Sequence, residues 1–228
     1  MNLVQNFITK NDCWKYNVQQ LDERYTRFQE EGPKGLMLHS VGCGEPTADV
    51  WVERWNKPGM QIMVHAFVEP DRVVQTFPWR YRAWHAGGCG NDSYIGVEMT
   101  EPASIVYPDP MKAEWVDKDP AASRAHMLAV YTQAVELFAY LCKEFHLDPL
   151  GDGVIVSHAE GHKRGVASGH ADPEHIWNKM GLTMDGFRRD VAKRAFHPDP
   201  FVCHTFHLPL FFLKAQSVFG KTFFNLTK

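Results

Sequence analysis

The sequence has 228 residues, of which 44% are hydrophobic and 22% are charged, close to the averages of soluble globular proteins. These proportions exclude a wholly disordered, collagen-like or coiled-coil chain, and the length allows a core that needs no disulfide or metal to hold it. The formal net charge is −3, without the basic excess typical of proteins that bind nucleic acid or an anionic membrane. The unusual feature is 12 histidines beside 5 cysteines, because histidine is the commonest neutral metal ligand.

Four short apolar runs in the first half of the chain predict buried strands. The second and third flank Glu-Pro-Asp-Arg, a segment that favours a turn. A Pro-rich stretch, residues 102–120, then forms a long connection of the kind that often borders a functional site. The four predicted strands are residues 36–41, 61–68, 73–77 and 94–99.

The second half of the chain is mainly helical. Apolar residues recur at steps of three and four over residues 121–145, which predicts a long helix with a wide apolar face. Residues 154–156 predict another buried strand. A second helix is expected after Asp172-Pro173, with Asp as the cap and Pro in the first turn, and a third over residues 183–194.

This order of elements predicts an α/β fold with a single mixed β-sheet flanked by helices. We expect one domain over residues 1–195, followed by a tail of residues 196–228 that is rich in Phe and Leu and has no clear periodicity. Apolar residues of such a tail have to pack on the domain or on a partner.

The cysteines and the N-terminus indicate where the chain folds. No CxxC pair occurs, which excludes the common Cys-based zinc motifs. The odd number of cysteines favours folding in a reducing compartment, although one buried disulfide remains an alternative. The first residues lack the basic and apolar segments of a secretory signal, and no window is apolar enough for a membrane span. We therefore expect a chain made in the cytoplasm without a cleaved signal.

Two of the histidines stand where a metal site would need them. His39 lies inside the first apolar run, and His158 directly follows the strand at residues 154–156. Downstream, His170-Ala-Asp172 adds a carboxylate, so that two nitrogens and one oxygen would leave the fourth position of a zinc ion open, as catalytic zinc requires. The alternative for each histidine alone is a core residue bonded to backbone, and for His65 that structural role is the preferred interpretation.

Glu98 is the second unusual residue, because a carboxylate inside an apolar strand is costly to bury unless it is paired or functional. If its side chain faces a cleft that holds a metal, burial raises its pKa and suits it to take a proton from water. In the alternative interpretation it pairs with a neighbouring base such as Arg80 or Arg82.

Taken together, these motifs resemble the zinc-dependent N-acetylmuramoyl-L-alanine amidases of type 2, which occur in bacterial autolysins and in phage and prophage endolysins. The resemblance rests on the His of the first strand, Trp84-His85-Ala-Gly, Asn91, the Ile-Gly-Val-Glu strand and the late His with Asp-Pro. It covers about residues 1–194 and implies the fold shared with peptidoglycan recognition proteins.

The resemblance implies a role for each motif residue. Zinc would be held by His39, His158 and Asp172, and Glu98 would be the general base. His85 would line the substrate cleft.

His170 falls where many members of the family carry Lys, a donor to the tetrahedral oxyanion. An imidazolium can donate the same hydrogen bond, although it loses its charge near neutral pH. The spacing from His158 to Asp172 is longer than in many members, which implies an inserted loop at residues 161–169. His170 and His175 are therefore alternatives to Asp172 for the third metal ligand.

The implied activity is zinc-dependent hydrolysis of the amide bond between N-acetylmuramic acid and L-alanine, with peptidoglycan as partner and the cell wall as the place of action after release. Trp84, Tyr94, Trp115 and Trp177 could supply apolar walls for the substrate, although aromatics there are more often core. Two alternatives stay open: a peptidoglycan-binding module of the same fold without activity, and a zinc peptidase that cuts within the stem peptide. No HExxH motif is present, which disfavours a zincin.

Overall fold

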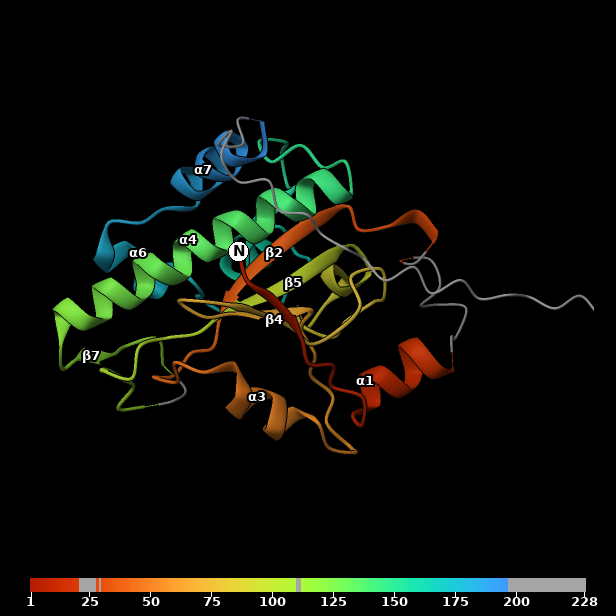
Figure 1. Cartoon of the computed structure of the whole chain (residues 1–228), viewed down its shortest axis with the longest axis horizontal. Coiled ribbons are helices and arrows are strands. Elements are labelled where there is room, and N and C mark those ends of the chain that lie inside the picture. The colour runs from red at the N-terminus through yellow and green to blue at the C-terminus, as the bar shows by residue number, and fades with distance from the viewer. Residues whose placement is uncertain (21–27, 29, 110–111, 197–228) are drawn as a thin grey trace, which may run out of the picture. The chain divides into compact units, whose positions relative to one another are not determined.

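A mixed six-stranded β-sheet forms the centre of the computed structural model, which describes residues 1–20, 28, 30–109 and 112–196 (Figure 1). The strand order is β1-β4-β3-β5-β2-β8. β3 and β4 are antiparallel, and every other neighbouring pair is parallel. The predicted fold class is therefore confirmed. The strands are β1 (Leu3–Gln5), β2 (Gly35–Ser40), β3 (Ala66–Val68), β4 (Val73–Gln75), β5 (Tyr94–Met99) and β8 (Ile155–Ser157).

The helices flank this sheet, and a two-stranded pairing of β6 (Ile105–Val106) with β7 (Val116–Asp117) lies in the Pro-rich connection. The helices are α1 (Asp12–Trp14), which continues as a π-helical turn (Lys15–Gln19), α3 (Ala48–Trp55), α4 (Pro120–Glu144), α5 (His158–Lys163), α6 (Glu174–Met180) and α7 (Met184–Phe196), with a 3₁₀ turn at Cys89–Asp92. Within the described residues, none of these helices is long and apolar enough to span a membrane.

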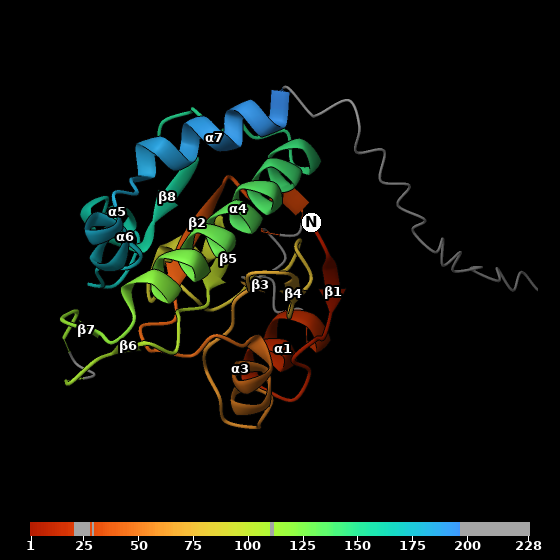
Figure 2. The same ribbon diagram turned by 60° about the vertical axis from the view of Figure 1, so that its left-hand side comes forward.

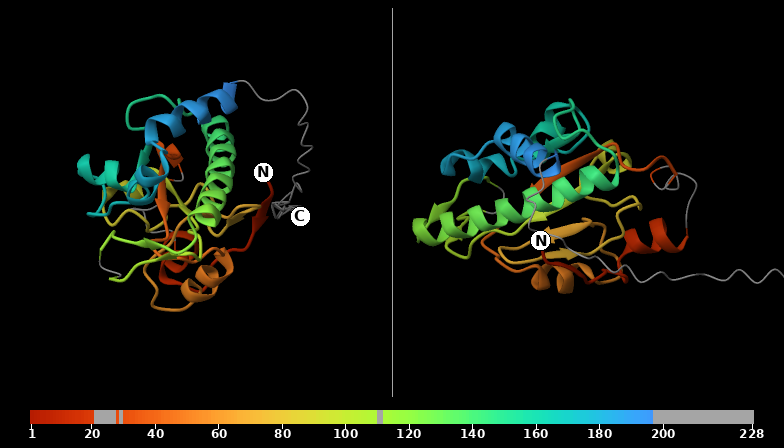
Figure 3. Two further views of the ribbon diagram at one scale, coloured as in Figure 1. Left: turned by 90° about the vertical axis from the view of Figure 1, so that its left-hand side faces the viewer. Right: turned by 45° about the horizontal axis from the view of Figure 1, so that its top comes forward.

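The two faces of the sheet are covered differently, because successive side chains of a strand point to opposite faces. Leu36 and Leu38 of β2 belong to the core that α4, α6 and α7 complete, as do Ile95 and Val97 of β5. Figures 2 and 3 show α4 and α7 side by side on that face, with α1 and α3 on the other. The alternate residues of β2 and β5, His39 and Glu98 among them, therefore belong to the face opposite α4.

A second core lies on that opposite face, toward the β3 and β4 side of the sheet. Phe67 and Val74 from the strands pack there with Val52 and Trp55 of α3 and with Cys13 of α1. This core covers one part of the face. The remaining part, at the ends of β2, β5 and β8, carries the pocket described below.

Most of the predicted elements are confirmed. The runs at residues 36–41, 94–99 and 154–156 are β2, β5 and β8, and the long predicted helix is α4. α4 begins after Asp119, whose side chain accepts from the backbone N–H of Ala122 at 3.1 Å. The third predicted helix is α7, displaced by one or two residues. β1, α1 and α3 were not predicted.

The predicted strand at residues 61–68 is too long, because only Ala66–Val68 pairs as a strand. The carbonyl of His65 accepts from the backbone N–H groups of both Thr76 and Phe77, so the ladder is irregular there. Two residues earlier, the N–H of Met63 donates to the carbonyl of Trp84. A run of apolar residues does not reveal such a local change of partner.

Of two further expectations about residues 158–173, one is correct in part and the other is wrong. The predicted loop at residues 161–169 is shorter than expected: residues 161–163 belong to α5, which a capping box of Ser157 and Glu160 starts at His158, and residues 164–169 form no helix or strand. Asp172 does not cap α6: Pro173 occupies the N-cap position, and no side chain caps that end. The Asp172 carboxylate faces the histidines instead.

Two expectations concern the cysteines and the tail. Cys13, Cys43, Cys89 and Cys142 are free thiols. Cys203 and residues 197–228 lie outside the described residues, so the boundary at residue 195 and the role of the tail stay predictions.

Candidate metal and catalytic site

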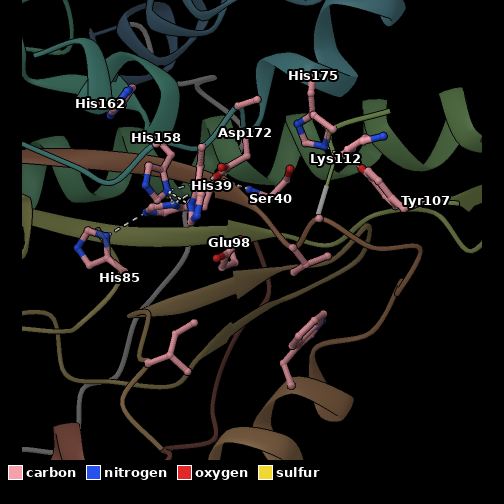
Figure 4. Close-up of a pocket in the computed structure, with 18 of the residues that line it drawn as sticks. His39, Ser40, His85, Glu98, Tyr107, Lys112, His158, His162, Asp172 and His175 are labelled. Carbon is pink, nitrogen blue, oxygen red and sulfur yellow. Dashed lines mark hydrogen bonds and ion pairs between the residues drawn. The ribbon is translucent and has the colours of Figure 1, made fainter. Parts of the chain in front are cut away.

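Three side chains that are far apart in the sequence meet at one edge of the sheet. His39 comes from the end of β2, and His158 is the first residue of α5, directly after the neighbouring strand β8. Asp172 comes from the segment before α6. Figure 4 shows them at one end of a pocket of about 780 Å³, with Tyr107, Lys112 and His175 toward the other end.

The distances between the three side chains fit a metal ion. The Nδ1 atoms of His39 and His158 are 2.9 Å apart, and Oδ2 of Asp172 lies 3.4 Å from the first and 3.7 Å from the second. Four ligand atoms about 2.0–2.1 Å from a tetrahedral zinc ion would be about 3.3 Å from one another. Within the described residues, no other group of three His, Cys, Asp or Glu side chains meets in this way.

The charges of two of these groups, His158 and Asp172, are those that a metal site needs. Burial, together with the neighbouring charge of His39, lowers the pKa of His158 to about 4. Burial by itself would raise the pKa of Asp172, but the hydrogen bond and charge of His39 and the charge of His158 outweigh it and lower that pKa. At neutral pH the pair His158 and Asp172 is therefore a neutral imidazole and a carboxylate, the forms that bind metal.

Local structure holds these ligand atoms in place. In the capping box of α5, Ser157 Oγ accepts from the N–H of Glu160, and the Glu160 carboxylate accepts from the N–H of Ser157, which fixes the backbone just before His158. The N–H of Ala159 donates to the backbone carbonyl of Asp172 at 3.2 Å. The segment that carries Asp172 is thereby tied to the start of α5.

Glu98 lines the same pocket, on β5 next to β2. Its Oε2 atom is buried and has no hydrogen-bond partner. Burial raises the pKa of Glu98 well above its ordinary value, and the charges of Asp172 and Glu101 raise it further. The predicted alternative, a pair with Arg80 or Arg82, is wrong: among the described contacts Arg82 bonds Asp92, and the guanidinium of Arg80 lies over the ring of Phe145.

His170 and His175, the two alternatives to Asp172, differ in position. His170 is exposed, and its Nδ1 lies 3.3 Å from Nδ1 of His158, beside the ligand atoms. His175 faces away from them, with Nε2 at 2.8 Å from the hydroxyl of Tyr107 and 3.7 Å from Oε1 of Glu101. Asp172 is therefore the group that approaches both His39 and His158.

A polar network around Glu101 forms the neighbouring wall of the pocket. The buried Glu101 carboxylate accepts from the N–H of Gly42 at 2.9 Å and from the hydroxyl of Tyr107 at 2.7 Å. Burial raises the pKa of Glu101 to about 7, although these hydrogen bonds lower it. Trp115 Nε1 also donates to the carbonyl of His175 at 3.2 Å, so the Pro-rich connection holds the first turn of α6.

Three more histidines lie near the ligands, and two of them, His85 and His162, line the pocket. His85 is buried, and its Nδ1 is 2.9 Å from Nε2 of His39. His65 is fully buried between the N–H of Gly96 and the carbonyl of Tyr81, which is the structural role predicted for it. His162 is exposed at the rim of the pocket.

Several pocket residues were missed from the sequence. Trp51 and Trp55 of α3 line the pocket, whereas Trp84, Tyr94, Trp115 and Trp177 are not among its described lining residues. α3 had no strong sequence signal, so its tryptophans could not be placed. Tyr107 and Lys112 come from the Pro-rich connection. The sequence predicted that this connection borders a site, but it did not single out these two residues.

Comparison with known proteins gives a family match and distant relatives. A family model described as N-acetylmuramoyl-L-alanine amidase matches residues 29–175. The chain is 26% identical over 178 residues to a bifunctional autolysin of Staphylococcus epidermidis, and 24% identical over 192 residues to one of Staphylococcus aureus strain Mu50. These matches cover 75% and 80% of this chain but only 12% and 14% of the autolysins.

Similar solved structures support the fold. Staphylococcus aureus hydrolase AmiA, solved in complex with its ligand, has a TM-score of 0.61 at 18% identity, with 86% of this chain and 83% of that chain covered. The catalytic domain of XlyA has a TM-score of 0.54 at 20% identity, with 84% and 99% covered. The solution structure of the PlyG catalytic domain gives 0.55 at 16% identity, with 86% and 96% covered.

Proposed function

The chain belongs to the N-acetylmuramoyl-L-alanine amidase family, and we propose that it hydrolyses the amide bond between N-acetylmuramic acid and the L-alanine of the peptidoglycan stem peptide. The observation that carries the proposal is the convergence of His39, His158 and Asp172 beside Glu98 in one pocket. The similarity to autolysins agrees with peptidoglycan as the substrate and the cell wall as the place of action.

We propose zinc as the metal, held by His39, His158 and Asp172. Two imidazole nitrogens and one carboxylate oxygen form a donor set that zinc accepts, and a fourth position would be left for water or substrate. When bound, zinc supplies positive charge that polarises the substrate carbonyl and lowers the pKa of water. The unpaired Oε2 of Glu98 is a buried acceptor in the same pocket.

In this proposal Glu98 moves the proton. Its burial and the neighbouring carboxylates raise its pKa, which makes its carboxylate a stronger base than that of an exposed glutamate. Glu98 accepts a proton as the oxygen of water adds to the amide carbon. The same proton then goes to the nitrogen as the C–N bond breaks, which gives a lactyl carboxylate and a free N-terminal alanine.

His170 is proposed as the donor to the tetrahedral oxyanion. Its ring lies next to that of His158, with the centroids 4.3 Å apart, and it is exposed toward the pocket. One donor placed at a developing oxyanion contributes about 3–4 kcal/mol to transition-state stabilisation. We assign the apolar wall of Trp51 and Trp55 to substrate contact.

Two alternative functions differ from this one in measurable products. A binding module of the same fold would release nothing, but such a module needs no buried, unpaired carboxylate beside three metal-binding groups. A peptidase acting within the stem peptide would release new N-termini other than alanine. The complete donor set together with Glu98 favours an enzyme over a binding module, and the family match favours the amidase over a peptidase.

The test is digestion of purified cell-wall sacculi, with new N-terminal alanine and new reducing sugar ends measured in parallel. The amidase releases alanine N-termini without reducing ends, and loses this activity on chelation and regains it with zinc. The appearance of reducing ends, or of N-termini other than alanine, would contradict the proposal. An Asn56→Ala variant serves as a control, because Asn56 contacts the backbone of Thr9 and Lys10 outside the pocket.

A further inference from the structure

His85 lies directly behind the proposed metal ligand His39. It is buried, with 8% of its surface exposed, and both of its ring nitrogens have a partner. Its Nδ1 lies 2.9 Å from Nε2 of His39, and its Nε2 lies 3.0 Å from the backbone carbonyl of Tyr94. Figure 4 shows the contact between the two rings as a dashed line. His85 therefore connects His39 to the backbone of β5.

The hydrogen positions along this chain follow from the partner at its end. A carbonyl oxygen only accepts, so Nε2 of His85 must carry the hydrogen that it donates to Tyr94. The other ring nitrogen of His85, Nδ1, faces Nε2 of His39. In a neutral ring with hydrogen on Nε2, Nδ1 is an acceptor. His39 then donates from Nε2, so Nδ1 is the nitrogen of His39 that can offer a lone pair to a metal.

Two residues of the same sequence motifs hold His85 in this place. The side-chain oxygen of Asn91 accepts from the backbone N–H groups of His85 and Ala86, at 2.9 and 2.8 Å. Gly96 leaves room for the ring, because a Cβ atom at position 96 would stand 2.3 Å from Cγ of His85. The position of the His85 side chain therefore depends on three parts of the sequence: its own motif Trp84-His85-Ala-Gly, the Asn that follows it, and the glycine of the Ile-Gly-Val-Glu strand.

We infer that His85 is a positioning residue that fixes the tautomer and orientation of His39, with Asn91 and Gly96 as its supports. The inference rests on the proposed metal site and not on substrate contact by His85, the role that the family resemblance implied. A ligand histidine whose other nitrogen is held in this way binds metal more tightly, because no free energy is spent on selecting its tautomer or ring angle.

The first experiment measures zinc affinity without substrate, by competition with a chelator of known affinity. His85→Ala weakens zinc binding by about tenfold or more, the range for partners of ligand histidines. His85→Asn restores part of the loss, because its amide oxygen can still accept from Nε2 of His39. His162→Ala, which removes another pocket histidine without a contact to His39, binds zinc like the wild type. Wild-type affinity in His85→Ala would overturn the inference.

The second experiment uses Gly96→Ala in both backgrounds. The added methyl displaces the His85 ring and weakens zinc binding in the wild-type chain. In the His85→Ala background the space is empty, so Gly96→Ala has no further effect on zinc affinity and the two changes are not additive. An equal loss in both backgrounds would show that Gly96 acts on the sheet and not through His85, and would contradict the inference.

A spectroscopic measurement separates a positioning role from a loss of folding. In the metal-free protein, long-range ¹H–¹⁵N spectra report which nitrogen of each neutral histidine carries hydrogen. His39 is expected as the Nε2–H tautomer in the wild type and as a mixture in His85→Ala, and a wild-type Nδ1–H tautomer overturns the inference. Because no step uses peptidoglycan, failure of the sacculus assay and failure of this inference are distinguishable.

Discussion

His39 and Glu98 are paired residues in the register of two neighbouring parallel strands, β2 and β5. Paired residues of parallel strands point to the same face and lie about 4.8 Å apart along the hydrogen-bonding direction. The proposed base therefore stands beside a proposed metal ligand on the face of the sheet that α4 and α7 leave uncovered. This pairing places the proton acceptor next to the metal-binding groups, while its Oε2 atom has no hydrogen-bond partner among the described residues.

The first prediction concerns Glu98. Glu98→Gln keeps the size of the side chain but cannot take a proton, so kcat on sacculi is expected to fall by about 10²–10⁴-fold. Zinc affinity stays within a few fold, because Glu98 is not one of the three ligands. Glu136→Gln, a change on α4 outside the pocket, keeps wild-type activity. If Glu98→Gln retains wild-type kcat, Glu98 is not the base.

The second prediction concerns the third ligand. Asp172→Ala removes one of the three ligand atoms, and zinc affinity is expected to fall by more than the 10–100-fold typical of outer partners. His175→Gln leaves affinity within about tenfold, because His175 faces Tyr107 and Glu101. Chelator competition on the two purified variants measures both zinc affinities. A larger loss of affinity in His175→Gln than in Asp172→Ala would exclude Asp172 as the third ligand.

The third prediction concerns the network around Glu101. Tyr107→Phe removes the hydroxyl that donates to the buried Glu101 carboxylate, so the free energy of unfolding is expected to fall by about 1–3 kcal/mol. Tyr131→Phe is the matched control, since its hydroxyl donates to Asp190 at 2.8 Å but that carboxylate is half-exposed and water can replace the lost bond. Urea unfolding of both variants gives the comparison; equal losses would contradict a special role for the Glu101 network.

The fourth prediction concerns stability in acid. Burial lowers the pKa of His65 to about 4, against about 6.5 in an unfolded chain, so the unfolded state binds more protons between these pH values. This contribution to stability is complete above pH 6.5 and is lost as the pH falls through 4, by about 3 kcal/mol.

A His65→Gln variant tests this pH dependence. The variant is less stable at pH 7, but its free energy of unfolding falls less steeply between pH 6.5 and 4 than that of the wild type. Part of the slope remains, because His85 and His158 also have lowered pKa values. Urea unfolding of metal-free protein at several pH values measures both slopes, and parallel slopes would exclude His65 as a source of acid sensitivity.

The sequence by itself determined the class of fold and the strongest elements. The period of apolar residues over residues 121–145 predicted α4, and the short apolar runs predicted β2, β5 and β8, because these elements bury side chains along their whole length. Elements that depend on a few local contacts were missed. α5 is the clearest case, since the capping pair Ser157 and Glu160 was present in the sequence as a readable signal.

The candidates His39, His158, Asp172 and Glu98 also came from the sequence. His39, His158 and Glu98 are polar residues in or just after apolar strands, and Asp172 was a candidate from the His170-Ala-Asp172 motif and the family resemblance. Their distances came only from the tertiary structure. Strand register brings His39 beside Glu98, and the order β5-β2-β8 brings His158 beside His39. Neither register nor strand order follows from the apolar pattern of a single strand, because both are fixed by contacts between residues distant along the chain.

The tertiary structure also gave positions to residues whose roles the sequence left open. Asp172 approaches the two histidines, whereas the ring of His175 contacts Tyr107 and its backbone carbonyl accepts from Trp115. The place of His85 depends in the same way on a glycine eleven positions later, since only the absence of a Cβ at Gly96 leaves room for its ring. The residue types determine which chemical groups the site contains, and packing between distant segments determines the distances between those groups.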